Sequence, residues 1–445
     1  MTGLLTDLYE LTMAAGYFEA GKTDDRATFE LFARKLPPNR NFLLAAGLAQ
    51  AVEYLQNLRF TPEEIDYLRG LPQFARTSAG FFEMLAAMRF TGDLFAMPEG
   101  TPIFAGEPFL TVRAPLIEAQ IAETYLLSII GFQSMIATKA VRVVKAAMGR
   151  EVVEFGTRRA HSPEAGVLAG RAAYIGGCAG TSNAETGLRY GVPVFGTAAH
   201  SWVMAFDNER ASFEHLQRLL GESTVYLIDS YDTLEGARRA AALGRPLWGV
   251  RLDSGNLVEL APAVRKILDD AGLRDAKIMA TGDLNEHKIH ELIAARAPID
   301  MFGVGTELAT SADAPSLGVV YKLVELESAE SGRRYTFKSS EDKATLPGGK
   351  QVFRFPEHDV IGRNTECVGC KDGRALAEAL LRPVMLRGSL VEPLPTAEHA
   401  RRHAAESMAL LPAPCHSLFE SHAWRVELSP ELQQLDEQVR QGAPL

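Results

Sequence analysis

The chain has 445 residues, of which 47% are hydrophobic and 23% charged, and its formal net charge is −10. This length and composition are typical of a folded protein with two or three domains and a large core. The negative charge disfavours binding to nucleic acid, and no apolar run of roughly 18 residues indicates a membrane span. The N-terminus lacks the basic and apolar regions of a signal peptide, and only four cysteines occur, so we expect a cytoplasmic protein.

An N-terminal α+β domain is expected over positions 1–130. An apolar stripe predicts a helix over residues 8–18, and alternation predicts a half-buried strand over residues 27–33. Residues 61–90 are expected to be helical, entered at a threonine cap that is followed by proline. Residues 92–112 carry the Pro and Gly punctuation of a small antiparallel sheet or sandwich.

Residues 131–325 alternate short apolar runs with helical stretches, which predicts repeated βα units and a parallel sheet. The runs are residues 151–155, 192–196, 225–229, 247–251, 277–281 and 301–305. Most of them end in Gly, Asp, Arg, His or Thr, and polar residues at strand ends are typical of an α/β barrel with its site on that face. An open, doubly wound parallel sheet is the alternative.

Residues 326–445 return to β-hairpin character, with Gly348 and Gly349 between two short β-like segments, and become helical from about residue 390. The cysteine motif CVGC falls here, at residues 367–370. Cys367 and Cys370 would form a zinc site with Cys415 and a nearby histidine, but a second pair with matching spacing is missing. We therefore expect two solvated thiols in a loop, and the question of zinc stays open.

Two strand ends carry residues suited to a flat, anionic ligand. EFGTRR at residues 154–159 offers Phe155 for ring stacking and Arg158 for a phosphate or carboxylate. GGCAGTSN at residues 176–183 is a turn whose backbone N–H groups suit an anion. Ordinary packing, with solvated arginines and a tight turn, is the competing interpretation of each motif.

Four more motifs follow apolar runs. GTAAHSW at residues 196–202 presents His200, a candidate base or phosphoryl acceptor, and VRLDSG at residues 250–255 presents Arg251 and Asp253 for phosphate and for Mg²⁺ or ribose hydroxyls. A capping histidine and a surface ion pair are the alternatives. TGD at residues 281–283 and GVGT at residues 303–306 add further polar turns. Six such strand ends together favour an active site for phosphorylated ligands.

These motifs closely resemble the nicotinate phosphoribosyltransferase family. The matching segments are TDLYELTM at residues 6–13, FELFARK at 29–35, EFGTRR at 154–159, GTAAHSW at 196–202, RLDSG at 251–255 and FGVGT at 302–306. They run in order from residue 6 to about residue 355, whereas the C-terminal part of the chain matches only loosely.

The resemblance implies a type II phosphoribosyltransferase fold. It comprises an N-terminal sandwich-like α+β domain (residues 1–130), an irregular α/β barrel (131–325), and C-terminal chain (326–445) that returns to complete the first domain. The implied reaction joins nicotinate to phosphoribosyl pyrophosphate, giving nicotinate mononucleotide and pyrophosphate in NAD salvage. ATP, with Mg²⁺, is hydrolysed through a phosphorylated histidine. The implied assembly is a homodimer with shared active sites.

The resemblance also implies a role for each matching residue. His200 is the phosphorylated histidine, and Arg251 and Asp253 orient the ring and the ribose. Tyr9, given across the homodimer, and Phe155 sandwich the pyridine ring. The remaining assignments are Arg158, Gly282, Gly303, Gly305 and Thr306 around the nucleotide phosphate, and Arg34, Lys338 and Lys343 at the pyrophosphate end.

Ser182 predicts the choice of base. The related nicotinamide enzyme carries an aspartate in the equivalent Gly-Thr turn, and an aspartate would repel the carboxylate of nicotinate, to which a serine hydroxyl can donate. The alternatives are a nicotinamide-preferring enzyme, the decarboxylating quinolinate enzyme, a sensor without catalysis, and a barrel aldolase or isomerase for sugar phosphates. The last would need a Schiff-base lysine at a strand end, and none of the six runs has one suitably placed.

Overall fold

The computed structural model describes residues 2–340, 343–371, 374–375 and 377–442, with the backbone alone at 370, 371, 374 and 375. The chain divides into two compact units, and each is described by itself. The first comprises Met1–Met135, Ser316–Pro395 and His403–Leu445, and the second comprises Ile136–Pro315 and Thr396–Arg402. The C-terminal part of the chain therefore returns to pack with the N-terminal part.

A seven-stranded antiparallel sheet forms the centre of the first unit, in the order β13-β12-β1-β5-β3-β19-β20. Its strands are β1 (Arg26–Ala33), β3 (Asp93–Ala96), β5 (Pro108–Pro115), β12 (Val319–Ser328), β13 (Gly332–Tyr335), β19 (Arg382–Leu386) and β20 (Ser389–Leu390). Central β1 pairs with β5 and with β12, and most of its residues are buried. The expected half-buried strand is thus wrong in its exposure, because consecutive residues of β1, whose side chains point to opposite faces of the sheet, are buried.

The remaining strands of the first unit form small sheets. A four-stranded sheet, β18-β14-β15-β21, contains Glu378–Ala379, Lys350–Arg354, Asp359–Arg363 and Val426–Leu428. Two strand pairs are β2 (Leu43–Leu44) with β4 (Pro102–Ile103), and β16 (Cys370–Lys371) with β17 (Arg374–Ala375). The expected hairpin around Gly348 and Gly349 is wrong, because β14 begins there but pairs with β15, which follows it, and with β18.

The predicted helix at residues 8–18 is confirmed in the first unit, and the predicted helical stretch at residues 61–90 forms two separate helices. The helices of this unit are α1 (Leu8–Glu19), α2 (Leu48–Asn57), α3 (Pro62–Gly70), α4 (Ala79–Ala87), α5 (Leu116–Ile121) and α16 (Pro430–Arg440). At α3, Thr61 accepts from the backbone N–H of Glu64 while the Glu64 side chain accepts from the N–H of Thr61, so the expected threonine cap forms a capping box. Helices α6 (Glu123–Ala146) and α15 (Ala397–Ala409) contribute residues to both units.

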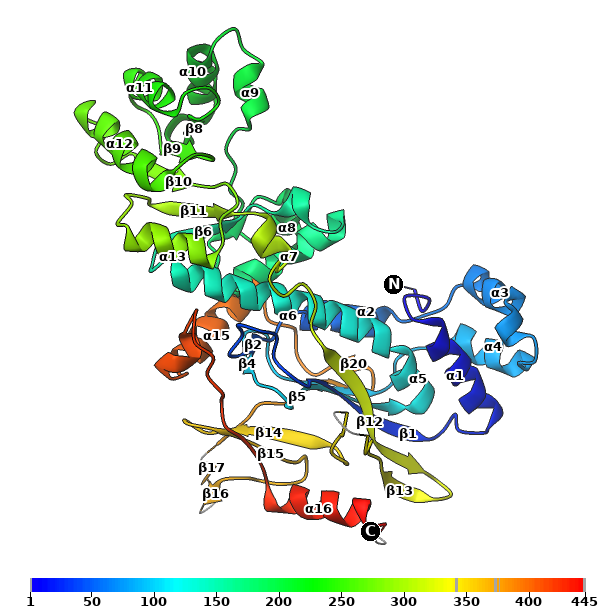
Figure 1. The fold of residues 1–445 in the computed structure, drawn as a ribbon. Helices are drawn as coiled ribbons and strands as arrows, with labels where there is room; N and C mark the ends of the chain where they lie inside the picture. Colours follow the sequence, from blue (N-terminus) through cyan, green and yellow to red (C-terminus); the bar gives the residue numbers. More distant parts are fainter. Residues whose placement is uncertain (1, 341–342, 372–373, 376, 443–445) are drawn as a thin grey trace. The chain divides into compact units, whose positions relative to one another are not determined.

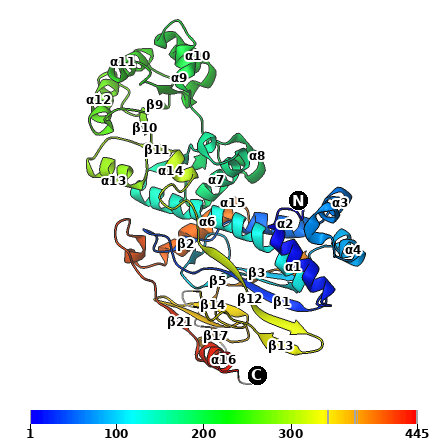
Figure 2. The same cartoon turned by 45° about the vertical axis from the view of Figure 1, so that its right-hand side comes forward.

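The second unit is built on a six-stranded parallel sheet in the order β7-β6-β11-β10-β9-β8. Its strands are β6 (Glu151–Glu154), β7 (Gly180–Thr181), β8 (Val225–Leu227), β9 (Gly249–Leu252), β10 (Lys277–Ala280) and β11 (Met301–Val304). Its helices are α7 (Pro163–Ile175), α8 (Ala184–Tyr190), α9 (His200–Met204), α10 (Glu209–Leu220), α11 (Thr233–Leu243), α12 (Leu257–Asp270), α13 (Glu286–Ala294) and α14 (Thr306–Ala309). In both cartoon views α11 and α12 lie beside the β8–β10 part of the sheet (Figures 1 and 2).

Five of the six apolar runs form strands of this sheet, as predicted. Residues 192–196 do not form a strand, and within them only Val194 forms a β-bridge, to Thr181. The sixth strand of the sheet, β7, forms instead within the predicted glycine turn at residues 176–183. Side chains from neighbouring strands, Val153, Met279 and Met301, form a buried cluster. The partly buried Phe155, which follows β6, packs against this cluster.

Helix α6 is long and apolar enough to cross a membrane by length and composition, with a mean hydropathy of 1.3 over its most apolar window. Of that window, 72% is buried inside the protein, as in the core helix of a folded domain. Within the described part of the chain it is the one helix that meets this criterion.

Candidate active site

A cavity of about 570 Å³ lies in the second unit, where the loops after β6, β7, β9, β10 and β11 meet. Predicted site residues that line it are Phe155, Arg158, Ser182, Arg251, Asp253, Gly282, Gly303, Gly305 and Thr306. Carboxyl ends of parallel strands emerge on one edge of a sheet, so residues far apart in the sequence converge there. The structure thus brings these residues together, as the sequence predicted.

Two of the glycines are required by the packing of neighbouring strand ends. A Cβ at Gly303 would lie 2.6 Å from the ring of Phe155 and from Thr281, so this glycine leaves room for the aromatic ring. Gly282 has a φ of +87°, and a Cβ there would clash with the carbonyl oxygen of Asp253. Gly305 differs, because a Cβ there would lie 3.4 Å from its nearest neighbour, the Phe155 carbonyl oxygen. The backbone at Gly305 therefore has room beside it for a ligand.

Arginines give the cavity a positive wall. The Nη1 of Arg251 donates to the hydroxyl of Thr197, and its Nη2 lies 3.9 Å from Asp253 Oδ1. Burial lowers the pKa of Arg251, although an arginine stays charged at any physiological pH. Arg158 is exposed at the cavity and lowers that pKa further by like-charge repulsion. Three arginines, Arg158, Arg159 and Arg251, line this one cavity and favour a phosphate or carboxylate ligand.

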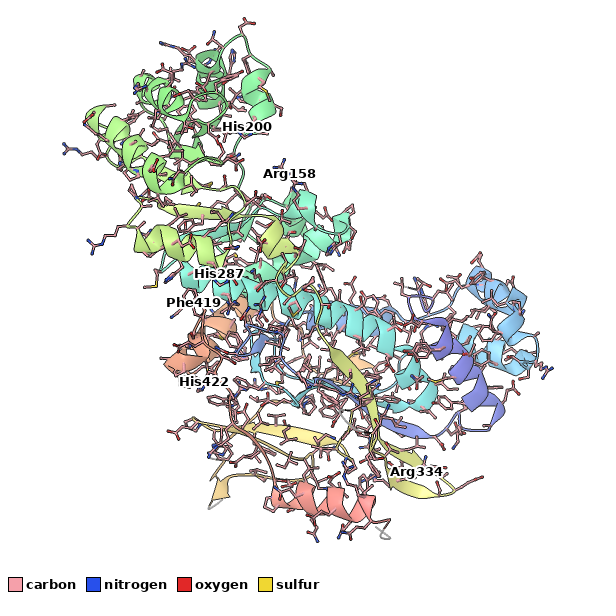
Figure 3. All side chains as sticks on the ribbon, viewed as in Figure 1. Arg158, His200, His287, Arg334, Phe419 and His422 are labelled. Atoms are coloured by element: carbon pink, nitrogen blue, oxygen red, sulfur yellow. The ribbon has the colours of Figure 1, made fainter. Side chains whose placement is uncertain are left out.

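His200 is the first residue of α9, next to the cavity-lining residues Thr197, Ala198 and Ala199. Its Nε2 lies 3.2 Å from Asp229 Oδ1, and the Asp229 side chain is only 1% exposed. The other oxygen of Asp229 accepts from the backbone N–H of Asp253 at 3.1 Å and from the Ser254 hydroxyl. Asp229 therefore links the histidine to the turn after β9 (Figure 3 labels His200 and Arg158). Asp229 is not among the predicted site residues, although it ends one of the apolar runs.

Glu154 is a second residue that the sequence analysis missed. Its carboxylate is completely buried, accepts a 2.6 Å hydrogen bond from the Thr181 hydroxyl, and also accepts from the backbone N–H of Gly156. Burial raises the pKa of Glu154 from 4.5 to about 7, against the lowering effect of these hydrogen bonds. The carboxyl ties the turn that carries Phe155 to the turn that carries Ser182.

Tyr9 and Lys338, both predicted site residues, line a separate cavity of about 450 Å³ in the first unit. Burial is the largest cause of the raised pKa of Tyr9. Burial and the negative charge of Glu10 raise the pKa of Glu123, on the same wall of the cavity, to about 7. Arg34 and Lys343 also belong to the first unit, where Arg34 is half-buried and Lys343 is exposed. The catalytic roles of these four residues stay predictions.

The expected pair of solvated thiols is wrong at Cys367, which is disulfide-bonded. The side chain of Cys370 lies outside the described residues, and Cys415 is a buried free thiol. Across the described ranges, no group of three His, Cys, Asp or Glu side chains has the arrangement of a metal site. A disulfide-bonded sulfur is not available as a thiolate ligand for zinc.

Known proteins resemble this chain over nearly its whole length. Residues 4–131 match the nicotinate phosphoribosyltransferase N-terminal domain, residues 150–334 match the nicotinate phosphoribosyltransferase family, and residues 370–436 match the corresponding C-terminal domain. Nicotinate phosphoribosyltransferase pncB2 of Mycobacterium tuberculosis is 47% identical over 93% of this chain and 89% of its own. Nicotinate phosphoribosyltransferase of Bacillus subtilis is 44% identical over 79% of this chain and 72% of its own.

The fold also matches a crystal structure of human nicotinic acid phosphoribosyltransferase. The TM-score is 0.86 at 29% sequence identity, over 98% of this chain and 99% of the human chain. This similarity confirms the predicted fold class, an α/β barrel-like domain with a separate α+β domain.

Proposed function

Because the chain belongs to the nicotinate phosphoribosyltransferase family, an enzyme family, we propose that it joins nicotinate to phosphoribosyl pyrophosphate in the cavity of its second unit and couples this step to ATP hydrolysis through His200. One observation supports the location above all: a single cavity gathers two aromatic rings, three arginines and glycine turns at the ends of parallel strands. We further propose that the product, nicotinate mononucleotide, enters NAD salvage in the cytoplasm.

Phe155 and Ser182 would hold the pyridine base. Phe155 is half-buried beside Gly303, so its ring is fixed in orientation with one part open to the cavity. Ser182 is exposed and lines the same cavity, and its neutral hydroxyl can donate a hydrogen bond to the carboxylate of nicotinate. These two residues favour a base that is flat and anionic, which distinguishes nicotinate from neutral nicotinamide.

Arg158, Arg251 and the turn at Gly305 and Thr306 would bind the phosphate groups. Formation of the C–N bond at the anomeric carbon passes through an oxocarbenium-like state, so the departing pyrophosphate needs cations to stabilise its charge. The two guanidinium groups supply fixed positive charge without proton transfer. Their convergence at one cavity supports this phosphate-binding role.

The carboxylates that line the cavity suit a Mg²⁺ ion whose other ligands would come from the substrate. The carboxylates of Asp253 and Asp283 line the cavity, and Mg²⁺ is commonly bound by one or two carboxylates together with substrate phosphates. When bound, the ion supplies Lewis-acid stabilisation of the pyrophosphate leaving group. Asp253 is held in place by the Thr281 hydroxyl, which donates to its Oδ1.

Asp229 would set the tautomer of His200. Since the carboxylate of Asp229 only accepts, the neighbouring Nε2 carries the proton, and the lone pair lies on Nδ1. In the proposed step this lone pair attacks the γ-phosphorus of ATP, the bond to the bridging oxygen breaks, and ADP leaves with that electron pair. The proton stays on Nε2, where the buried carboxylate stabilises the cationic ring. Hydrolysis of phosphohistidine then returns His200 and releases phosphate.

The subunits would form a homodimer with shared active sites. Tyr9 and Lys338 line a cavity of their own in the first unit, and half of the Tyr9 surface is exposed and available for a ligand or a second subunit. We propose that Tyr9 stacks on the base bound by a partner subunit, and that Arg34, Lys338 and Lys343 meet the pyrophosphate.

Phosphate transfer to the protein tests the coupling. The enzyme is incubated with ATP labelled at the γ-phosphate and Mg²⁺, and acid-labile phosphate is measured beside ADP release. We expect one label on His200, with a phosphorus NMR signal of an Nδ1-phosphohistidine, and no label in His200→Ala. Asp229→Asn should retain the fold and slow labelling. Normal labelling of His200→Ala would overturn the role of His200, and an Nε2-linked phosphate would overturn that of Asp229.

A further inference from the structure

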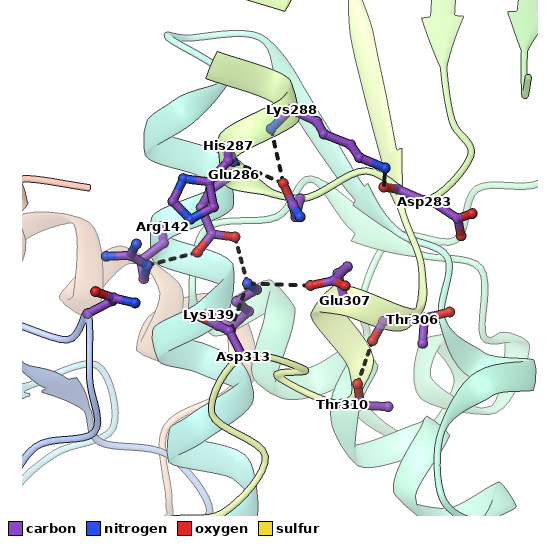
Figure 4. Close-up of polar contacts among 12 residues, drawn as sticks. Lys139, Arg142, Asp283, Glu286, His287, Lys288, Thr306, Glu307, Thr310 and Asp313 are labelled. Carbon is purple, nitrogen blue, oxygen red and sulfur yellow. Dashed lines mark hydrogen bonds and ion pairs between the residues drawn. The ribbon is translucent and has the colours of Figure 1, made fainter. Parts of the chain in front are cut away.

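A buried lysine joins three segments of the second unit. Lys139 of α6 is 1% exposed, and its ammonium lies 2.6 Å from Glu286 Oε2, 2.8 Å from Asp313 Oδ1 and 3.9 Å from Glu307 Oε2 (Figure 4). Arg142, one turn later on α6, donates from Nε to the other oxygen of Glu286 at 2.9 Å. We refer to Lys139, Arg142, Glu286, Glu307 and Asp313 as the Lys139 network.

Glu286 is charged within this network. Burial by itself raises the pKa of a carboxyl, but Lys139 and Arg142 outweigh burial and hold the pKa of Glu286 below its usual range. Two cations thus face three carboxylates, and Lys139 is the group that contacts all three. Without its ammonium, these carboxylates would repel one another, and the completely buried Glu286 would keep only Arg142 of its two cationic partners.

The positions of the carboxylates in the chain connect the network to the cavity. Glu286 is the first residue of α13, soon after the turn whose residues Thr281, Gly282 and Asp283 line the cavity. Glu307 follows Thr306, which also lines it. One ammonium therefore forms ion pairs with residues that follow both turns, at the ends of β10 and β11.

We propose that Lys139 is a positioning residue for phosphate binding, which sets the spacing between the turn at 281–283 and the turn at 303–306. This inference rests on the proposed function, because it takes these turns as the site of the nucleotide phosphate. Hydrogen bonds to a charged phosphate depend steeply on geometry, so a shift of one turn weakens phosphate binding more than it weakens stacking on Phe155, which packs beside Gly303.

The test compares two ligands that differ only in the phosphate. Binding of nicotinate mononucleotide and of nicotinate riboside to the full-length protein is measured by calorimetry for wild type and Lys139→Met. We expect the variant to bind the mononucleotide roughly tenfold more weakly, the effect of about one charge-assisted hydrogen bond, and to lose distinctly less affinity for the riboside. Equal weakening of both ligands, or of neither, would overturn the proposal.

Two further variants separate positioning from stability. Arg354→Met breaks an ion pair with the buried Asp359 in the first unit and serves as the control, for which the ratio of the two affinities should be unchanged. Asp313→Asn alters a carboxylate that is 29% exposed and tests the same network if Lys139→Met does not fold; we expect a smaller, phosphate-selective loss of about threefold. An unchanged mononucleotide affinity in Asp313→Asn would then count against the proposal.

The same data distinguish the two hypotheses. If wild type binds mononucleotide and riboside equally, the proposed phosphate site is wrong. If wild type prefers the mononucleotide and Lys139→Met keeps the whole preference, only the role of Lys139 is wrong.

Discussion

Replacement of Glu154 by glutamine should change how the stability of the protein depends on pH. Glu154 is completely buried between the Thr181 hydroxyl and the N–H of Gly156, and burial raises its pKa to about 7. Glutamine has nearly the same shape and can keep both contacts, because its oxygen accepts from the N–H and its amide donates to the rotatable hydroxyl. The substitution therefore removes the ionisation and leaves the packing.

The sign and size of the effect follow from the shift in pKa. A carboxyl whose pKa is higher in the folded state binds its proton more tightly when folded, so it contributes stability below pH 4.5 and loses it as the pH rises through about 7. A rise from 4.5 to about 7 corresponds to a free energy of ~3 kcal/mol. Wild type should lose this contribution to stability as the pH rises from 4.5 to about 7, and Glu154→Gln should not.

Urea unfolding at pH 5 and pH 8 measures this difference. Relative to wild type, we expect Glu154→Gln to gain about 2 to 3 kcal/mol in free energy of unfolding between the two pH values. Glu151→Gln, at the exposed start of the same strand, is the control and should show no such gain. A difference between Glu154→Gln and wild type that is constant from pH 5 to pH 8 would refute the account of this buried carboxyl.

Three other substitutions or treatments test the site, and a fourth tests the assembly. Ser182→Asp should raise the KM for nicotinate about tenfold by charge repulsion, with Ser182→Ala as the control; equal KM values in all three proteins would reject the explanation of base choice. Gly303→Ala should displace the ring of Phe155, which a Cβ would approach to 2.6 Å, and reduce kcat/KM by about tenfold or more, whereas unchanged kinetics would show that the ring is not needed. Chelation of Mg²⁺ should abolish turnover reversibly, and full activity in excess chelator would exclude a need for the ion. Mixing inactive Tyr9→Ala with inactive His200→Ala subunits should restore part of the activity if active sites are shared, and no recovery after verified subunit exchange would contradict sharing.

Local patterns predicted the polar side of the barrel well. Strand ends such as Arg251 and Gly305 could be recognised because each follows a short apolar run, and parallel strands place such ends on one edge. The same pattern holds for Asp229, which ends a run of its own; its importance becomes visible only when His200, from an earlier turn, is found beside it.

Features that depend on distant pairing could not be predicted. The strand β1 reads as half-buried because its partner β12 lies far away in the sequence, and no local signal announces this pairing. Lys139 appears in the sequence as a charge within an apolar helix, but its carboxylate partners come from later turns. The role of Gly303 in making room for Phe155 likewise depends on a contact between neighbouring strands.

The central claim is that this cavity joins nicotinate to phosphoribosyl pyrophosphate, and product identification by mass spectrometry tests it most directly. Purified protein is supplied with phosphoribosyl pyrophosphate, Mg²⁺ and ATP, and with nicotinate, nicotinamide or quinolinate in parallel. We expect nicotinate mononucleotide from nicotinate, with little product from the other two bases. A mononucleotide formed only from nicotinamide or quinolinate, or from none of the three, would contradict the account.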